Sequence, residues 1–218
     1  ADVNSGGMVI YDVATTPGVL DFEALGPSVY AHDVFVDNDI MYASEINADR
    51  LAIYDVSDPS NITLLGTRIT PFAFTHNAWS TPDGNFVFTT DERGNASTAA
   101  YDISNPANPV LLDEFRPERS LGTGTIPHNA HVLNDYLIIS HYTDGVEIVD
   151  ASVPSNMIEV GYYDSSTVPD GGFFGSWGAY PFLPSGLVLS SDIENGLFVI
   201  DVNYLRAARL KGTVTDGD

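Results

Sequence analysis

Three of the five histidines in this chain of 218 residues stand at the same point of a recurring sequence pattern. His32, His76 and His128 each directly precede a predicted hairpin, in which two apolar runs flank a turn rich in Gly, Asn or Asp. Neutral imidazole and carboxylate oxygen are ordinary ligands of divalent transition metals, and imidazole also titrates near neutral pH. The pattern therefore predicts either a metal site or acid–base chemistry, provided that the fold brings the hairpins together.

The partners of these histidines follow from centring each turn and pairing the flanking strands. This register places His32 opposite Glu45, His76 opposite Asp91 and His128 opposite His141. The candidate metal ligands are therefore His32, His76, His128, Glu45, Asp91 and His141. The ion would be a transition metal such as zinc, iron, manganese or copper, or else calcium, and no other cofactor is expected.

Two other roles for the histidines stay open. A histidine at a repeated position can join one structural repeat to the next by hydrogen bonds, or it can serve metal-free catalysis or ligand binding. His131 lies an odd number of residues from His128, so it should point to the opposite side of its strand and pack between repeats.

The last repeat has a tryptophan where the others have a histidine. Trp177 is expected opposite Asp192, and together with Trp79 these residues are candidates for binding a sugar or an aromatic ligand. Aromatic residues on inner strands are more often part of the core, and that alternative stands beside the first.

A second repeated unit predicts the elements that must position these side chains. Five segments share an apolar run, an Asp, a polar turn and a second apolar run, which predicts two β-strands around a tight turn. The aspartates, expected to cap the turns through hydrogen bonds to the backbone, are Asp12, Asp55, Asp102, Asp150 and Asp201. Their spacing of 43 to 51 residues fits one four-stranded propeller blade per repeat.

The sequence thus predicts an all-β fold, a β-propeller of four-stranded antiparallel blades with about four and a half blades present. A half blade is expected at residues 8–25, and full blades at 30–70, 74–116, 126–163 and 174–210. Residues 1–210 would form the propeller, and 211–218 a tail that could begin a further module. First strands of propeller blades line the central axis, so the histidines should gather there.

Composition excludes several classes of function. Thirty acidic residues face eight basic ones, giving a net charge of -22, so nucleic acid is not an expected partner. No apolar run approaches the ~20 residues of a membrane-spanning helix. The chain has no cysteine, which excludes disulfides and thiol nucleophiles.

The repeats also resemble a known family. VEIVDASVPSN and LAIYDVSDPSN resemble the LVIVD repeat, while THNAW, PHNAH and FGSWGAYPFLPSGLVLSSDIENGLFVI are similar to the C-terminal blades of the choice-of-anchor B family. That resemblance implies a bacterial propeller that is secreted or anchored at the cell surface, with about seven blades, of which roughly the first three would be missing here. It implies no reaction.

Three functions are compatible with these observations. The first is a secreted or cell-surface binding module or scaffold that holds a metal at its hub and recognises a glycan or a protein. The second is an extracellular metal-dependent hydrolase, lyase or oxidase that uses the hub histidines. The third is a structural subunit whose ring is completed by another chain or by further N-terminal blades.

Overall fold

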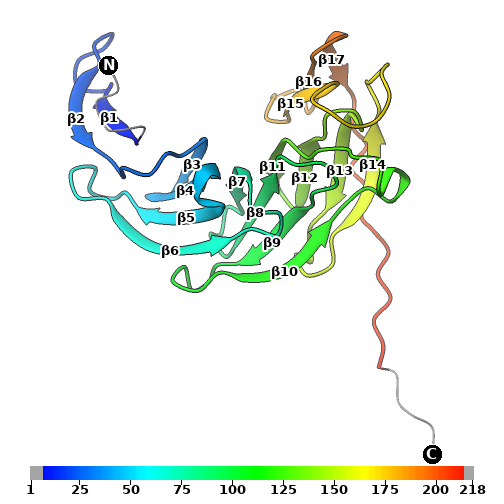
Figure 1. Cartoon of the computed structure of the whole chain (residues 1–218), viewed down its shortest axis with the longest axis horizontal. Coiled ribbons are helices and arrows are strands. Elements are labelled where there is room, and N and C mark those ends of the chain that lie inside the picture. The colour runs from blue at the N-terminus through cyan, green and yellow to red at the C-terminus, as the bar shows by residue number, and fades with distance from the viewer. Residues whose placement is uncertain (1–6, 214–218) are drawn as a thin grey trace, which may run out of the picture.

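The computed structural model describes residues 7–213, which form seventeen β-strands and two short 3-10 helices. The strands belong to five separate antiparallel sheets, and within each sheet consecutive strands are neighbours. Figure 1 shows the sheets following one another along a curved arc, with the N-terminal and C-terminal sheets at its two ends. The protein is all-β and has the blade arrangement of a propeller, as the repeat predicted.

The sheets occupy successive segments of the chain. The two-stranded first sheet contains β1 (Val9–Asp12) and β2 (Asp21–Leu25). The second contains β3 (Asp33–Asp37), β4 (Ile40–Glu45), β5 (Arg50–Asp55) and β6 (Thr63–Ile69). The third contains β7 (Thr75–Ser80), β8 (Phe86–Asp91), β9 (Thr98–Asp102) and β10 (Val110–Phe115). The helices are η1 (Ile46–Ala48) and η2 (Glu118–Ser120).

The last two sheets differ from each other. The fourth contains β11 (Asn129–Leu133), β12 (Tyr136–Ser140), β13 (Val146–Asp150) and β14 (Ile158–Tyr163). The fifth has only three strands, β15 (Ser176–Tyr180), β16 (Val188–Asp192) and β17 (Gly196–Ile200). The expectation of a full four-stranded blade within 174–210 was therefore wrong.

Hydrogen bonds to the preceding blade explain the missing strand. Asp150 is completely buried, and its Oδ2 accepts hydrogen bonds from the backbone N–H of Ala207 at 2.8 Å and from Nη1 of Arg209 at 3.2 Å. Tyr204 packs its ring against Tyr136, with centroids 5.1 Å apart. These contacts hold residues 204–209 against the fourth sheet, so they do not pair with β17.

The turn aspartates behave alike in the first four repeats. A carboxylate oxygen of Asp12, Asp55, Asp102 or Asp150 accepts a hydrogen bond from the backbone N–H two residues further on, at 2.7 to 2.9 Å. Such bonds fix the turn that joins two antiparallel strands. At Asp201 the structure shows no corresponding bond, because the chain continues there without a turn.

The core lies between neighbouring sheets. Phe88 of β8 packs in one cluster with Leu137 of β12 and Val149 of β13, and Ile53 of β5 packs in another with Tyr101 of β9. Strands buried on both faces read as continuous apolar runs, which is why the repeats look so hydrophobic.

The first strands of four successive sheets lie side by side. β7 contacts β3 and β11, and β11 contacts β15, so these strands line the inner side of the arc (Figure 1). No helix within residues 7–213 is long and apolar enough to cross a membrane. The predicted tail at 211–218 lies mostly outside the described residues.

Candidate metal centre

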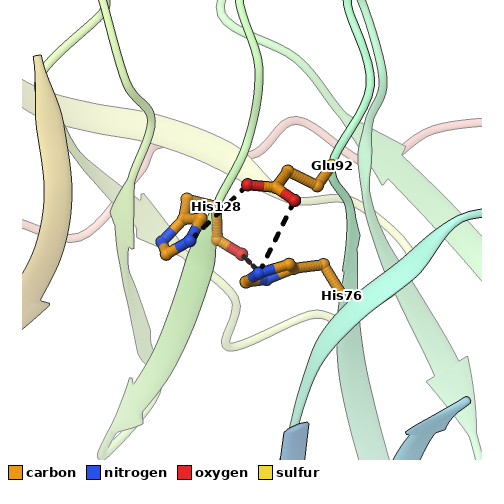
Figure 2. Close-up of side chains that lie close together, drawn as sticks. All are labelled: His76, Glu92 and His128. Atoms are coloured by element: carbon orange, nitrogen blue, oxygen red, sulfur yellow. Dashed lines mark hydrogen bonds and ion pairs between the residues drawn. The ribbon is translucent and has the colours of Figure 1, made fainter. Parts of the chain in front are cut away.

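Two of the predicted histidines meet a glutamate on the inner side of the arc. His76 of β7, Glu92 directly after β8 and His128 directly before β11 offer ligand atoms that all lie within 4.8 Å of one another. Nε2 of His76 lies 3.7 Å from Oε2 of Glu92, and Nε2 of His128 lies 3.7 Å from Oε1 of the same carboxylate. Figure 2 shows the carboxylate beside the two rings, with one interaction running to each of them.

The tautomer of His76 is fixed by the backbone of the next blade. Its Nδ1 lies 3.1 Å from the carbonyl oxygen of His128, and a carbonyl can only accept, so Nδ1 carries the hydrogen. In the neutral ring, Nε2 then presents a lone pair toward Glu92. Hydrogen bonding of the second ring nitrogen is the usual way in which proteins orient a metal-binding imidazole.

Burial keeps both rings neutral. His76 is 5% exposed and His128 is 4% exposed. Desolvation lowers the pKa of His76, and desolvation together with the neighbouring His76 lowers the pKa of His128 to about 3. Both imidazoles are therefore unprotonated at neutral pH, the state that a metal ligand requires.

Tyr142 holds the glutamate by a hydrogen bond. Its hydroxyl donates a hydrogen bond of 2.6 Å to Oε1 of Glu92, and burial and this bond raise the pKa of the phenol, so it remains a donor. Tyr142 has a positive φ of 39°, and two backbone hydrogen bonds with Ser176, of 2.9 and 3.0 Å, keep it there. Next to it, a Cβ on Gly175 would lie 2.3 Å from the carbonyl oxygen of Tyr142, so only glycine allows this approach.

His32 lies beside the cluster, on its exposed side. Its ring centroid is 4.4 Å from that of His76, with the planes at 50°, and its Nδ1 lies 3.4 Å from the hydroxyl of Tyr30. The three histidines predicted to converge are thus neighbours, with His32 at the rim.

Glu92 was missed by the sequence prediction, which chose Asp91. A β-bulge between Thr75 and Asn77 shifts the register, so that Thr75 rather than His76 is opposite Asp91. The apolar alternation that locates strands contains no signal for such a bulge. The acidic pair at the end of β8 was the one available hint.

The other predicted ligands have partners of their own. The carboxylate of Glu45 accepts hydrogen bonds from Arg50 and Tyr54, both at 2.5 Å. Oδ2 of Asp91 accepts a hydrogen bond from the backbone N–H of Phe72 at 2.9 Å. His128 and His141 each lie one residue beyond the pair Asn129 and Ser140, where the strand register ends, and Nδ1 of His141 lies 3.1 Å from Asp144. None of the three belongs to the cluster.

The predicted ligand-binding residues have different surroundings. Trp79 is stacked between Phe35 and Phe182, with centroid distances of 3.9 and 5.5 Å. Asp192 is buried and accepts a hydrogen bond of 2.7 Å from the Ser165 hydroxyl. Trp177 is 56% exposed and borders the pocket beside the cluster.

His131 also lies outside the cluster. Its ring is packed against Trp79 and Phe182, at centroid distances of 4.7 and 5.8 Å. Desolvation lowers its pKa to about 4. This position agrees with the packing role expected from its odd spacing to His128.

The sheets and their inner strands define a β-propeller-like repeat protein, and comparison with known proteins identifies the family. The model of the LVIVD repeat matches residues 30–70, 83–116 and 128–165, together more than half of the chain. The chain therefore belongs to the LVIVD repeat family. None of the curated proteins matches it in sequence.

Solved structures support the fold. A periplasmic gluconolactonase from Pseudomonas aeruginosa matches with a TM-score of 0.59 and 13% identity, over 80% of this chain and 51% of that one. A proposed 6-phosphogluconolactonase from Bacteroides uniformis matches with a TM-score of 0.57 and 17% identity, over 79% of this chain and 55% of that one. A protein from Lactobacillus plantarum matches with a TM-score of 0.70 and 12% identity, over 90% of this chain and 64% of that one. The chain spans about half to two thirds of these structures, and identities this low show the fold alone.

Proposed function

We propose that the hub of this propeller binds a divalent transition metal through Nε2 of His76, Nε2 of His128 and the carboxylate of Glu92. The observation that carries the proposal is the orientation of His76, whose Nδ1 is tied to the His128 carbonyl so that the lone pair of Nε2 faces the carboxylate. Two ligands bound at 2.0–2.1 Å to one tetrahedral ion lie roughly 3.3 Å apart. Each histidine Nε2 lies 3.7 Å from a carboxylate oxygen of Glu92, and all three ligand atoms lie within 4.8 Å of one another, so the side chains would have to move closer together to bind one ion.

The chemistry of the ligands favours zinc or a similar ion over calcium. Two of the three donors are imidazole nitrogens, whereas calcium takes six to eight oxygen ligands. Both rings are neutral at pH 7, so binding would not have to displace a proton from a charged imidazolium. The carboxylate of Glu92 would partly neutralise the charge of the ion.

The experiment is a metal-binding measurement on the purified chain. Metal-free protein is dialysed against zinc and then manganese, and the bound ion is quantified by elemental analysis. We expect about one equivalent of zinc, with affinity falling by at least ~100-fold in His76→Ala, His128→Ala and Glu92→Gln. His131→Phe is the matched control, because it changes a half-buried histidine outside the cluster. Equal binding by wild type and the three variants would refute the site.

A fold control separates loss of ligands from loss of structure. Each variant is compared with wild type by circular dichroism and by its denaturant midpoint without metal. Glu92→Gln keeps the size of the side chain and can still accept from Tyr142, so this variant is expected to fold even if a histidine variant does not.

A second candidate function is metal-dependent hydrolysis. Three protein ligands leave a tetrahedral ion one open position, and catalytic zinc sites use this position for water. The cluster borders an open pocket, which would give a substrate access to that position. Release of product from an ester or lactone by the zinc-loaded chain, lost in Glu92→Gln, would favour this candidate over a binding module.

Location and partners are proposals that rest on the family resemblance. We propose a secreted or surface-anchored module that recognises a glycan or a protein, with the hub site as part of its binding surface. A ring completed by another chain or by further blades is compatible with the open arc in Figure 1. Scattering data that fit a lone open arc at all concentrations would argue against completion by a second copy.

A further inference from the structure

We infer that the pocket beside the His76–Glu92–His128 cluster binds the ring of a neutral, hydroxylated ligand such as a monosaccharide, stacked on Trp177. The inference rests on the proposed metal site and adds a ligand class to it. In this arrangement the C–H face of the sugar packs on the indole and one hydroxyl oxygen takes the open position of the metal.

The backbone around Trp177 has the same irregularity as the backbone around the proposed ligand His76. A β-bulge between Ser176 and Gly178 surrounds it, as a bulge between Thr75 and Asn77 surrounds His76. The backbone carbonyl of Trp177 accepts a hydrogen bond of 3.2 Å from Ser140 Oγ, which ties it to the blade that carries His128. The indole thus lies beside the cluster, with its centroid 5.6 Å from that of the His128 ring.

The indole still has surface to offer a ligand. Trp177 is 56% exposed, although it touches His128 and borders the pocket. Trp79, the other tryptophan, differs because aromatic rings cover it on both sides. An exposed tryptophan at the mouth of a polar pocket offers a flat apolar surface next to hydrogen-bonding groups, which is what the two faces of a sugar ring require.

The polar groups of the pocket suit hydroxyl donors. The lining adds Asp33 and Asn129 to the cluster, His32 and Trp177. Asp33 is held by hydrogen bonds from the Val34 backbone N–H and from Asn77 Nδ2, both at 2.8 Å, so its carboxylate is fixed in place. Each carboxylate oxygen can accept a further hydrogen bond, and sugar hydroxyls would supply it.

The overall charge of the chain selects against anions. The pocket lining contains two carboxylates, Asp33 and Glu92, and no lysine or arginine, so a bound divalent ion would leave the pocket itself close to neutral. The whole chain carries a net charge of -22, so an acidic sugar or a sugar phosphate would be repelled as it approaches. A neutral ring meets no such barrier.

The test uses the zinc-loaded chain and follows Trp177 by fluorescence. Trp79→Phe removes the other tryptophan, so that the signal comes from Trp177 alone. The probes are glucose, galactose, mannose, xylose and N-acetylglucosamine, with glucuronate, which keeps the pyranose ring, as the anionic counterpart of glucose. We expect a saturable change with at least one neutral sugar, at a Kd of roughly 1 mM or below, and at least tenfold weaker binding of glucuronate.

Two variants locate the binding by calorimetry in the otherwise unchanged chain. Trp177→Ala should lose at least tenfold in sugar affinity while it retains zinc, whereas Tyr180→Ala removes an exposed aromatic residue of the same strand and should change neither. Zinc binding without a response to any of the sugars, or with glucuronate preferred, would overturn this inference and leave the metal site intact. Absence of zinc binding would overturn both.

Discussion

His76 donates the hydrogen of Nδ1 to the backbone carbonyl of His128 across the boundary between the third and fourth sheets, over 3.1 Å. The bond joins the side chain of one proposed ligand to the backbone of the other. This repeated histidine therefore links two blades, the structural role that the sequence left open, and it also presents Nε2 to Glu92.

The Tyr142 hydroxyl should tune metal affinity without binding the ion. Tyr142→Phe removes the 2.6 Å hydrogen bond to Glu92 and frees the carboxylate to rotate. Loss of such a supporting bond typically weakens metal binding by about 10–100-fold. Zinc affinity measured by competition with a chelator should fall within that range while one equivalent still binds at saturation. An unchanged affinity would show that Tyr142 does not position the ligand.

Stability of the metal-free protein should fall as the pH drops below neutral. The folded pKa of His128 is about 3, below the ordinary value of 6.5, so the unfolded chain binds more protons between these two values. The stability that the neutral His128 side chain contributes is fully present above pH ~6.5 and is lost as the pH falls toward 3. Its slope approaches about 1.4 kcal/mol per pH unit for one histidine.

The check is a series of urea unfolding curves from pH 7 to pH 4, in wild type and His128→Gln. The variant cannot take up this proton on unfolding. The slope of its free energy of unfolding against pH should therefore be smaller than that of wild type, by up to about 1.4 kcal/mol per pH unit. Parallel pH profiles for the two proteins would contradict the buried neutral state of His128.

Two glycines at equivalent strand positions should respond differently to substitution. Gly66 pairs with Ile53 in one blade, and Gly161 pairs with Ile148 in another. A Cβ on Gly66 would lie 2.0 Å from the carbonyl oxygen of Pro106, whereas on Gly161 its nearest contact is 3.9 Å from Ile148 Cβ. Gly66→Ala must therefore push the neighbouring blade away.

We expect Gly66→Ala to lower the free energy of unfolding by about 2 kcal/mol or more, and Gly161→Ala to change it by less than ~1 kcal/mol. Thermal or urea unfolding of both variants measures the difference. Equal effects at the two positions would mean that the blades are not packed as closely as described.

The sequence was sufficient to predict most of the fold, because the repeated strand and turn signals are local. It also predicted that His76 and His128 would converge, since residues at one repeat position of a propeller face one axis. It could not predict Glu92, which depends on a bulge at His76. It could not predict that residues 204–209 leave the last sheet, because that path depends on hydrogen bonds to Asp150, more than fifty residues away.

The central claim is tested most directly by anomalous X-ray diffraction from crystals of the chain grown with zinc. We predict a single strong anomalous peak within about 2.0–2.2 Å of Nε2 of His76, Nε2 of His128 and a carboxylate oxygen of Glu92. A peak elsewhere, or no zinc peak between these side chains at saturating metal, would contradict the proposed hub site.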